Sequence, residues 1–477
     1  MQKKYYITAA IPYVNARPHV GHALEFVQTD TVARFHKLLG DDVCTLSGGD
    51  ENALKNVQAA ESANEPVQDF VDNNTNSFFE LTSKLNCQFD IWQKGSDKKH
   101  HKASQRLWGL VKENNPDDIY EKEYEGLYCV GCEAFYTQDE LNEKGVCSEH
   151  PGKPLEKVKE KNYFFRLSKY QKRLIEIIDK EEIKIWPGHR KNEVLQFIKQ
   201  GLEDISISRS NERAKNWGVP VPGDDTQRMY VWFDALNIYQ SGVGFGWDEE
   251  KYNKYWPADL HVIGKGILRF HAIYWPAFLL SANLKLPKAI FVHDYFTVNG
   301  QKMSKSVGNV VDPIEMINKY GADALRYYFL AKFSPFNDGD FSEEKLKEVY
   351  NADLANGLGN LVARVAKLAE NNSLNAKTVI YHDEIYPDVF KSFSNFRYDN
   401  ALTSIWERVK RLDTLINKVK LWENTKDKLN ILEECVEEIL WIAYNLRPFL
   451  PETAHKITKQ FSQKKIISAD PLFPRIK

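Results

Sequence analysis

Two histidines near the N-terminus stand where phosphate chemistry is possible. Residues 4–8 are rich in β-branched and aromatic side chains, which predicts a short buried strand. Prolines interrupt the chain after it, and His19, Gly21 and His22 then open a helical run to about Leu38. A strand, a tight turn and a helix N-terminus place backbone N–H groups and the positive end of the helix dipole where a phosphate can bind. Alone, the pattern fits equally well two histidines that cap a helix.

A second candidate segment lies far downstream and contains two lysines. Lys302 and Lys305 flank Met303 and Ser304 in a loop that follows a strand-like run at 289–292. Two ammonium groups on a mobile loop can close on a polyphosphate, each acting as a point charge. Taken alone, such a pair is more often part of a solvated basic loop.

Four side chains of metal-ligand type fall within one short stretch. Cys129, Cys132, Cys147 and His150 have the spacing C-x2-C-x14-C-x2-H, which is typical of two ligand pairs around one tetrahedral zinc ion. Because protein would fill all four positions, the pattern predicts a structural zinc and not a catalytic one. Its role would be to hold together a small insertion without a core of its own. Free thiols in a reducing compartment are the alternative.

The elements that must position these residues follow an α/β pattern. Up to residue 114, strand-like and helical runs alternate, which predicts a parallel sheet with helices on both faces. Asp50 follows the second strand, at about 43–46, and ligands gather at the carboxyl ends of such strands. It is therefore placed for an ammonium group or a ribose hydroxyl, and its alternative role is to cap the next helix. The pattern changes over 115–225 and the sheet pattern resumes with 229–239.

The remainder of the chain is predicted to be helical from about residue 348. Apolar residues recur there every three or four positions in three successive runs, which indicates an antiparallel bundle.

Composition restricts the class of protein. The chain has 477 residues, 43% hydrophobic and 27% charged, with a net charge of −2, as expected of a globular protein with several structural units. No apolar run approaches the roughly 18–20 residues that cross a bilayer, and the N-terminus lacks a signal-peptide layout. We therefore expect a cytoplasmic protein without a membrane segment. Any RNA-binding surface must be a local patch, since the net charge does not favour nucleic acid.

The two phosphate-type motifs, HVGH and KMSKS, resemble in this order the HIGH and KMSKS signatures of class I aminoacyl-tRNA synthetases. Within that class the chain resembles the methionyl-tRNA synthetase family from Ala9 to about Ala454. The segments that carry this likeness are AAIPYVNARPHVGH, GLYCVGCEAFY, YVWFDALNIY, GKGILRFHAIYWP, VNGQKMSKSVGN, GNLVAR and NLRPFLPETA.

The resemblance implies an α/β fold with a Rossmann-type parallel-sheet catalytic domain, an inserted zinc-knuckle module and a following all-α anticodon-binding bundle. The implied parts are 1–114, the first half of the catalytic domain; 115–225, the connective insertion with the zinc knuckle; 226–310, the second catalytic half; 311–347, a stem-contact or linker segment; and 348–477, the α-helical anticodon-binding domain.

The activity implied by the resemblance is ligation of L-methionine to tRNA(Met), through methionyl-adenylate formed with ATP and Mg²⁺. One structural Zn²⁺ per chain is implied as well. Because the chain ends soon after the bundle, without the appended tRNA-binding or dimerising domain of some relatives, we expect a monomer.

The resemblance also assigns roles to individual residues. The catalytic residues are His19, His22, Lys302 and Lys305, and the ATP-binding ones are Gly21, Lys265 and Ser304. The methionine site comprises Ile11, Tyr13, Asp50, Trp232, Ala235, Leu236, Tyr239 and His271. The anticodon is read by Asn360, Arg364 and Trp422, and the zinc ligands are Cys129, Cys132, Cys147 and His150. Within the methionine site, Asp50 would bind the ammonium, and Tyr13 and His271 would offer polar hydrogens toward the sulfur.

Three positions depart from the family pattern. Asn52 stands where the family commonly has a histidine, Gly266 where it has an acid, and Leu421 where a proline often precedes the anticodon tryptophan. The first two bear on the contacts with the ATP ribose.

Other functions fit the sequence less well. The isoleucine, leucine and valine enzymes of the class carry an editing insertion too large for the roughly 110 residues between the sheet halves. The cysteine enzyme holds zinc in its active site, whereas the ligands here lie in the insertion. An inactive tRNA-binding paralogue would not need both intact motifs, and a small nucleotidyltransferase with the same histidine turn would not need the helical bundle.

Overall fold

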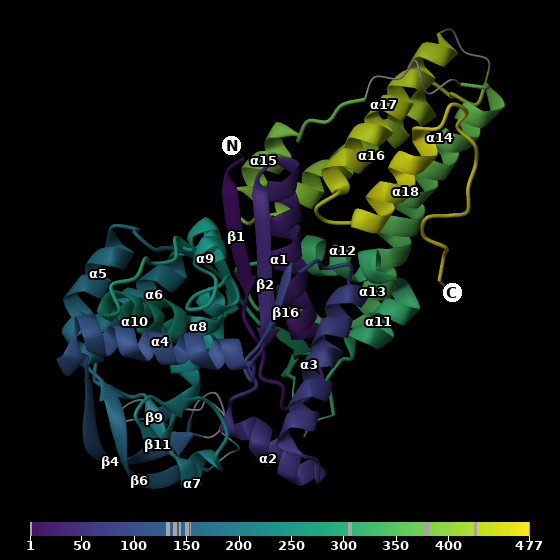
Figure 1. Cartoon of the computed structure of the whole chain (residues 1–477). Helices are drawn as coiled ribbons and strands as arrows, with labels where there is room; N and C mark the ends of the chain where they lie inside the picture. The colour runs from purple at the N-terminus through teal and green to yellow at the C-terminus, as the bar shows by residue number, and fades with distance from the viewer. Residues whose placement is uncertain are drawn as a thin grey trace. The chain divides into compact units, whose positions relative to one another are not determined.

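The computed structural model divides the chain into two compact units (Figure 1). Unit 1 comprises Met1–Pro18, Leu39–Glu80 and Gln88–His293, and unit 2 comprises His19–Leu38, Leu81–Cys87 and Asp294–Lys477. The residues whose structure is described are 2–129, 134–136, 141–142, 145–147, 152, 154–303, 308–374, 381–423 and 427–476. The strand before the histidine motif therefore belongs to unit 1, and the helix that the motif opens belongs to unit 2.

Unit 1 is built on a six-stranded sheet in which every neighbouring pair is parallel. In sheet order the strands are β3 (Ile91–Lys94), β2 (Asp42–Gly49), β1 (Lys4–Ala9), β12 (Leu260–Gly264), β13 (Ala289–His293) and β7 (Lys184–Trp186). The chain order reverses direction between β1 and β12, and ligands of such sheets bind at the carboxyl ends of the strands beside this switch point. The predicted parallel-sheet domain is confirmed.

The central strands are largely buried because both faces of the sheet are covered. Every residue of β12 and β13 is buried, and Ile7 of β1 pairs with Leu260 while Tyr6 pairs with Cys44. The few polar side chains of these strands are buried as well, and Thr8 of β1 and His261 of β12 lie 2.7 Å apart across the sheet.

Two smaller antiparallel sheets occupy the part of the chain that the sequence assigns to the insertion. They are β5-β4-β6-β8 and β10-β11-β9, formed by β4 (Ile119–Cys129), β5 (Ala134–Tyr136), β6 (Glu156–Phe165), β8 (Ile205–Ser206), β9 (Ser208–Ser210), β10 (Pro220–Val221) and β11 (Asp224–Met229). The same stretch also supplies β7, which pairs with β13 at the edge of the parallel sheet.

The helices of unit 1 cover the parallel sheet and carry part of the site. They are α2 (Leu54–Ala63), α4 (Lys98–Asn114), α5 (Gln171–Asp179), α6 (Gly188–Lys199), α7 (Asn211–Ala214), α8 (Val231–Ser241), α9 (Glu249–Tyr255) and α10 (Trp275–Ser281), while α3 (Val67–Lys84) passes from unit 1 into unit 2. Helices α4, α8 and α10 pack against one another (Figure 1).

Residues 229–239 differ from the sequence expectation of a resumed sheet. Met229 ends β11, and from Val231 the chain forms α8, in which all eleven residues are buried. A short, mostly apolar run does not distinguish a buried strand from a buried helix, and tertiary packing decides between them.

Unit 2 combines a small sheet with the helical part of the chain. Its strands β14 (Phe296–Val298), β15 (Gln301–Lys302) and β16 (Gly339–Phe341) pair in the order β15-β14-β16. Its helices are α1 (Val20–Leu38), α11 (Pro313–Tyr320), α12 (Ala322–Lys332), α13 (Glu343–Val349), a π-helix at Tyr350–Gly359, α14 (Asn360–Asn371), α15 (Pro387–Phe393), α16 (Tyr398–Lys418), α17 (Lys428–Leu446) and α18 (Pro451–Phe461). The expected helical C-terminal region is thus confirmed.

A buried arginine connects α1 to the rest of unit 2. The fully buried guanidinium of Arg326 on α12 lies 2.8 Å from an Asp30 carboxylate oxygen on α1. It also donates to the carbonyl oxygens of Pro448 and Phe449, in the turn between α17 and α18, at 3.0 and 2.8 Å. A buried charge needs such partners, so α1 is held in one place relative to α12 and this turn.

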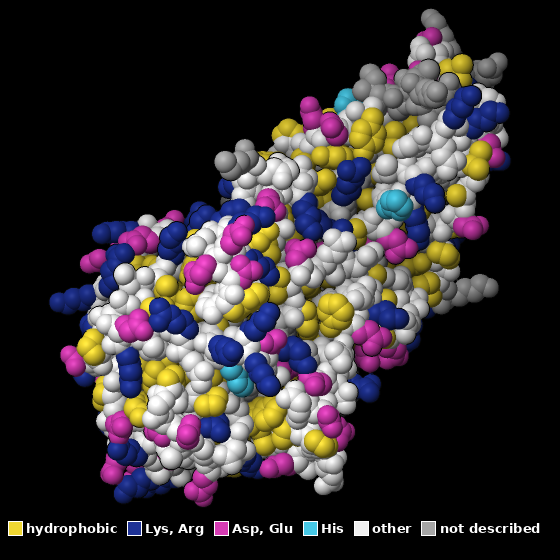
Figure 2. Space-filling view, viewed as in Figure 1, with side chains coloured by type: hydrophobic (Ala, Val, Ile, Leu, Met, Phe, Trp, Pro, Cys, Tyr) yellow, Lys and Arg dark blue, Asp and Glu magenta, His cyan; other side chains and the backbone are white. Residues whose placement is uncertain are grey.

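The surface carries charges of both signs. On the face shown in Figure 2, outside the grey residues, Lys and Arg side chains alternate with Asp and Glu without one broad field of a single sign. Within the part of the chain that the structure describes, no helix combines the length and apolar character needed to span a membrane.

Candidate active site

The loops after β1 and β2 meet beside the switch point of the parallel sheet. Tyr13 forms a parallel bridge with Asp50, whose backbone N–H donates to the Pro12 carbonyl at 2.9 Å. Asp50 is buried, and Asn56 donates to its carbonyl oxygen at 2.8 Å. The N-cap of α2 is Ala53, not Asp50. The alternative role of Asp50 as a helix cap is therefore excluded, and its position fits a contact with ligand.

A cluster of aromatic side chains, called the aromatic pouch below, lies beside this loop, within unit 1. The edge of Tyr13 meets Trp232 of α8 with ring centroids 6.2 Å apart, and Trp232 stacks on Phe270 at 3.8 Å. His271 meets Trp232 edge-on at 6.3 Å. Ala235, Leu236 and Tyr239, on the following turns of α8, are all buried, and the partly buried Ile11 packs against the same core. Aromatic edges of this kind suit a thioether side chain. The structure therefore brings Tyr13, Trp232, Tyr239 and His271 together, and their role in binding methionine stays a prediction.

His271 has a hydrogen-bond partner at each of its two ring nitrogens. Its Nδ1 lies 2.9 Å from the Ile267 carbonyl oxygen, which can only accept a hydrogen bond, so Nδ1 carries the proton. Its Nε2 then accepts from the Tyr239 hydroxyl at 2.8 Å. The one N–H of His271 is thus used by the main chain, and a polar hydrogen from His271 toward the methionine sulfur stays a prediction. The ring shapes the pouch through its edge.

Burial fixes the protonation state of the histidines around the pouch. Desolvation lowers the pKa of His271 to about 4. It lowers the pKa of His261 well below the ordinary value, with the neighbouring His271 adding to the effect. His261 Nδ1 is 2.7 Å from the Thr8 hydroxyl, and its ring lies 4.5 Å from that of Tyr239. These rings are neutral at pH 7, so the wall of the pouch carries no charge from them.

Three further residues of the pouch were not identified from the sequence. Phe270 provides the stacking surface for Trp232, the Lys55 ammonium lies 3.1 Å from the centre of the Tyr13 ring, and His261 is described above. Phe270 is adjacent to His271 in a π-helix, Phe270–Tyr274. π-Helical turns are frequent at functional sites, but their position is not evident from residue spacing.

The departure at Asn52 has a structural role. Its side-chain amide donates to Asp234 on α8 at 2.6 Å and to the Gly95 carbonyl at 2.9 Å. The neighbouring Glu51 is fully buried and accepts from Thr75 at 2.6 Å. The loop that contains Asp50 is therefore fixed to the core by hydrogen bonds on both sides. Lys265, next to the other departure at Gly266, opens a short 3₁₀ turn (Lys265–Ile267) directly after β12.

The two motif histidines lie at the start of α1 in unit 2. Their rings stack with centroids 3.8 Å apart. The Gly21 N–H donates to Nδ1 of His19 at 3.1 Å, and the His19 N–H donates to Nδ1 of His22 at 3.2 Å. Because Nδ1 of each ring is an acceptor, the proton of the neutral ring is on Nε2. Both imidazoles can therefore present an N–H donor, which is the group that a phosphate oxygen requires.

Gly21 is required by the geometry of this motif. A Cβ atom at this position would lie 2.9 Å from Cε1 of His19 and 3.6 Å from the terminal methyl carbon of Met303. No side chain fits there without displacing the His19 ring. The same measurement places Met303, of the KMSKS segment, directly beside the histidine motif within unit 2.

A β-hairpin delivers the lysine segment to this point. Asn299 and Gly300, at φ values of 52° and 75°, form the turn between β14 and β15, as the Asn-Gly pair favours. The Gly300 N–H donates to Asp340 at 2.7 Å, and beyond the lysines the Val20 N–H of α1 donates to the Val311 carbonyl at 3.2 Å. Ser304, Lys305 and the side chain of Lys302 lie outside the described residues.

The three predicted anticodon residues also come together in unit 2. Asn360 is exposed at the start of α14, and Arg364 follows one turn later. The Arg364 guanidinium lies 5.0 Å from the centre of the Trp422 ring and is held by Asp413 at 3.1 Å and Asn417 at 2.7 Å. Trp422 is 50% exposed, whereas Leu421 is fully buried. An exposed tryptophan beside a fixed guanidinium is suited to stack on an unpaired base.

The predicted zinc site falls only partly within the described residues. Cys129 ends β4 and Cys147 follows, both fully buried and neither in a disulfide. Cys132 and His150 lie outside the described residues. Among the residues that the structure does describe, no group of three or more His, Cys, Asp or Glu side chains is placed to hold a metal ion.

The sequence model of the family described as "tRNA synthetases class I (M)" matches residues 5–366. The chain belongs to this family.

Several relatives of this chain are methionine–tRNA ligases. A methionine–tRNA ligase of Thermotoga maritima is 38% identical over 482 residues, which is 96% of this chain and 75% of the relative. One of Clostridium acetobutylicum is 39% identical over 97% of this chain and 74% of its own length. The crystal structure of Mycobacterium tuberculosis methionyl-tRNA synthetase bound by methionyl-adenylate superposes with a TM-score of 0.91 and 35% identity, over 99% of this chain and 100% of that one.

Proposed function

We propose that this protein is a methionine–tRNA ligase that activates L-methionine with ATP and transfers it to the 3′ end of tRNA(Met). The observation that carries the proposal is the aromatic pouch of Tyr13, Trp232, Tyr239 and His271 beside the buried Asp50, at the switch point of the parallel sheet. The family membership and the relatives that are methionine–tRNA ligases support it.

The aromatic pouch determines which amino acid the protein binds. Trp232, Ala235, Leu236 and the edges of Tyr13 and His271 contact the thioether side chain, and Ile11 with Asp50 holds the amino-acid backbone. The Asp50 carboxylate pairs with the ammonium group, which leaves the methionine carboxylate as the nucleophile. Neutral histidines around the pouch favour an uncharged side chain, because burying a charge beside uncharged rings costs free energy.

The first step is attack of the methionine carboxylate on the α-phosphate of ATP, which forms methionyl-adenylate and releases pyrophosphate. His19 and His22 donate their Nε2 protons to phosphate oxygens, and Lys302 and Lys305 stabilise the leaving pyrophosphate. Gly21, Lys265 and Ser304 complete the ATP contacts. Mg²⁺ enters as part of the ATP substrate and neutralises phosphate charge. No covalent bond to the protein is needed, so these residues act by positioning and by charge stabilisation.

In the second step, a ribose hydroxyl at the 3′ end of the tRNA attacks the carbonyl carbon of the adenylate and releases AMP. Selection of tRNA(Met) is assigned to Asn360, Arg364 and Trp422, where bases can stack on the indole and bond to the amide and guanidinium. The part boundaries predicted from the sequence (1–114, 115–225, 226–310, 311–347 and 348–477) are proposed as the functional division of the chain.

A methionine-dependent exchange of labelled pyrophosphate into ATP tests the proposed function. We expect exchange with methionine and none with isoleucine, leucine, valine or cysteine. An absence of exchange in protein that still binds tRNA(Met) would instead identify an inactive tRNA-binding paralogue, and exchange with another amino acid would identify another synthetase.

We also propose one structural zinc ion per chain, held by Cys129, Cys132, Cys147 and His150. The two described cysteines fit this role, since they are buried and not joined in disulfides, and thiolates are preferred zinc ligands. Zinc would link the ends of the knuckle and supply folding energy to it. We expect about one zinc per chain by elemental analysis, lost in Cys147→Ser and kept in the matched control Cys435→Ser, whose thiol is buried in the helical bundle. Equal zinc content in both variants would contradict the assignment.

A further inference from the structure

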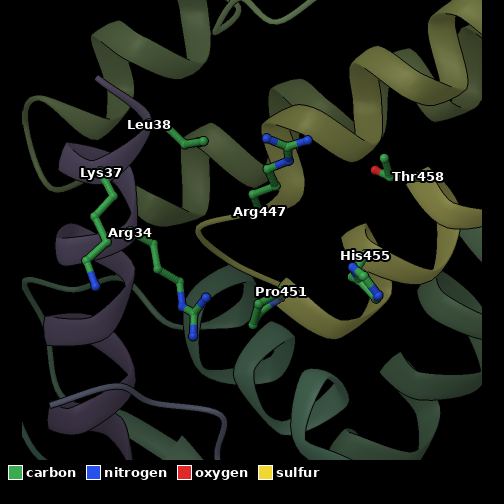
Figure 3. Close-up of a pocket in the computed structure, with 7 residues that line it drawn as sticks. All are labelled: Arg34, Lys37, Leu38, Arg447, Pro451, His455 and Thr458. Atoms are coloured by element: carbon green, nitrogen blue, oxygen red, sulfur yellow. The ribbon is translucent and has the colours of Figure 1, made fainter. Parts of the chain in front are cut away.

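A cavity in unit 2 is separate from the residues assigned above. It has a volume of about 310 Å³ and lies between the C-terminal half of α1 and the turn from α17 to α18 (Figure 3). Its lining residues are Arg34, Lys37 and Leu38 from α1, Arg447 at the end of α17, and Pro451, His455 and Thr458 from α18. None of them has a role in the proposed reaction.

The charge of this cavity is of one sign. Three permanently or normally cationic side chains and one imidazole line it, and no Asp or Glu does. Arg34 and Lys37 lie three residues apart on the same face of α1, an arrangement in which like charges repel. Figure 3 shows Arg447 and His455 across the cavity from them. An anion in this space would relieve the repulsion between the two walls.

The two guanidinium groups are held in place by contacts away from the cavity. Arg34 donates from Nε to Asp30 at 2.7 Å and from Nη2 to the Asn86 carbonyl at 2.6 Å. Arg447 donates from Nη2 to the Tyr381 hydroxyl at 2.6 Å. Each retains Nη1 without a hydrogen bond among the described residues. A fixed guanidinium loses little entropy when it binds, which favours recognition of a tetrahedral oxyanion.

The remaining three polar side chains of the lining, Lys37, His455 and Thr458, are available to a ligand. Lys37 and His455 are exposed, and neither has a side-chain hydrogen bond or ion pair within the described part of the chain. The hydroxyl of Thr458 is buried and likewise lacks a hydrogen-bond partner there. Figure 2 shows further basic side chains exposed over α18. The cavity therefore offers two guanidinium groups that hydrogen bonds hold in place, one on each wall. Lys37 and His455 add exposed groups at its rim.

We propose that this cavity is a phosphate-binding site, distinct from the ATP site. A phosphate group matches the positive charge of the cavity, its convergent N–H donors and its small size. The apolar Leu38 and Pro451 line the cavity without donating a hydrogen bond from their side chains. The phosphate has two sources in the proposed function: the backbone of the bound tRNA, or free phosphate and pyrophosphate. The first source depends on the proposed function, whereas the second does not.

The test uses the full chain and the double variant Lys37→Gln/His455→Gln. Both side chains are exposed and carry no structural bond in the described residues, so the variant is expected to fold and to keep wild-type pyrophosphate exchange. Lys456→Gln is the matched control, because Lys456 lies on the same helix outside the cavity lining and pairs with Glu452 at 2.7 Å.

Two measurements separate the sources. If the site binds the RNA backbone, tRNA affinity of the double variant falls several-fold, and the slope of log affinity against log salt decreases by about one. If it binds free phosphate, inorganic phosphate raises the melting temperature of the wild type above that in chloride at equal ionic strength, and the double variant loses this rise. The control variant behaves as the wild type in both.

An unchanged tRNA affinity and salt slope, together with no phosphate-dependent stabilisation of the wild type, would overturn the proposal. Failure of the wild type to catalyse pyrophosphate exchange would instead refute the proposed function. The phosphate titration gives its answer in either case, since it requires neither catalysis nor tRNA.

Discussion

At the scale of single residues, hydrogen bonds from the main chain determine what the motif histidines can do. The N–H groups of Gly21 and His19 occupy Nδ1 of the two rings, which directs the remaining proton of each to Nε2. A histidine at a helix start could otherwise adopt either tautomer. Local backbone geometry therefore prepares both side chains as donors before any ligand is present.

Gly21→Ala tests this arrangement. The added Cβ would lie 2.9 Å from the His19 ring, so the ring must move and its Nδ1 bond with it. We expect adenylate formation, measured by pyrophosphate exchange, to fall by about 10²-fold or more, as when one transition-state donor is removed. Methionine affinity, measured by tryptophan fluorescence, should remain within about two-fold, since its pouch lies in unit 1.

Gly109→Ala is the control for that variant. Gly109 lies in the middle of α4, where an added Cβ meets nothing closer than 3.9 Å. We expect full activity and a stability gain of about 1 kcal/mol, because alanine is the better helix former. Normal exchange in Gly21→Ala, or a loss that is equal in the two variants, would contradict the role given to Gly21.

The buried histidines of the pouch predict a pH dependence of stability. In the unfolded chain His271 titrates near its ordinary pKa of about 6.5, whereas burial lowers its pKa to about 4 in the folded protein. Between these values the unfolded state binds a proton that the folded state does not. The free energy of unfolding therefore falls as the pH decreases from about 6.5 to 4, by at most about 3 kcal/mol for this ring. His261 and His101, whose pKa values burial also lowers, act in the same direction.

Urea unfolding at pH 7 and pH 5 checks this prediction. The difference in unfolding free energy between the two pH values should be smaller in His271→Asn than in the wild type. It should be unchanged in His455→Gln, which alters an exposed ring on α18. A pH difference that is the same in all three proteins would show that His271 titrates normally.

At the scale of elements, α1 is the helix whose position matters most. It carries the histidine motif at its N-terminus and contributes Asp30 to the buried pair with Arg326 of α12. Near its other end, Phe35 stacks on Phe393 of α15 at 3.8 Å. Packing and a buried ion pair thus fix α1 along its length within unit 2, and the histidines inherit that fixed position.

Replacing Arg326 by Met should be strongly destabilising. It leaves Asp30 with Arg34 as its remaining ionic partner and removes the donors to the carbonyls of Pro448 and Phe449. Breaking one side of a buried pair costs about 3–5 kcal/mol, which we expect to measure by urea denaturation.

The double variant Arg326→Met/Asp30→Asn distinguishes the ion pair from packing. Removing the second charge should recover part of the lost stability, because the buried carboxylate that has lost Arg326 is then removed as well. If the double variant is less stable than the single one by the full cost of Asp30→Asn alone, the two residues do not interact energetically.

At the scale of the whole molecule, the proposed chemistry and the proposed tRNA selection use different side chains. The pouch belongs to unit 1, while Asn360, Arg364 and Trp422 belong to unit 2 and lie outside the histidine and lysine motifs. Variants of the anticodon residues should therefore change tRNA selection without changing the formation of methionyl-adenylate.

Trp422→Ala is expected to reduce kcat/KM for aminoacylation of tRNA(Met) by about 10- to 100-fold, the usual cost of losing one stacked base. Pyrophosphate exchange should stay at the wild-type rate, since methionine and ATP contact other residues. Trp247→Ala, which removes a 37% exposed tryptophan of unit 1, is the control and should change neither activity. A loss of exchange in Trp422→Ala, or normal aminoacylation, would contradict the anticodon assignment.

The sequence by itself determined the features that depend on local patterns. The alternation of strands and helices before residue 114 predicts the parallel sheet, because strands covered on both faces read as apolar runs between helices. The helical spacing after residue 348 predicts the bundle in the same way. The residues of the methionine site were identified through the family resemblance, and their roles remain predictions, as do those of Cys132, His150, Ser304 and Lys305, which lie outside the described residues.

Only the tertiary structure decided how those residues are arranged. It made 231–241 a helix, since a short, mostly apolar segment suits either element and tertiary packing decides between them. It bonded the N–H of His271 to the Ile267 carbonyl, and it gave Asn52 a partner in Asp234, 182 residues away along the chain. It also gathered Arg34, Arg447 and His455 around one cavity. Residue spacing describes one element at a time, whereas hydrogen-bond partners and cavities depend on how distant elements pack.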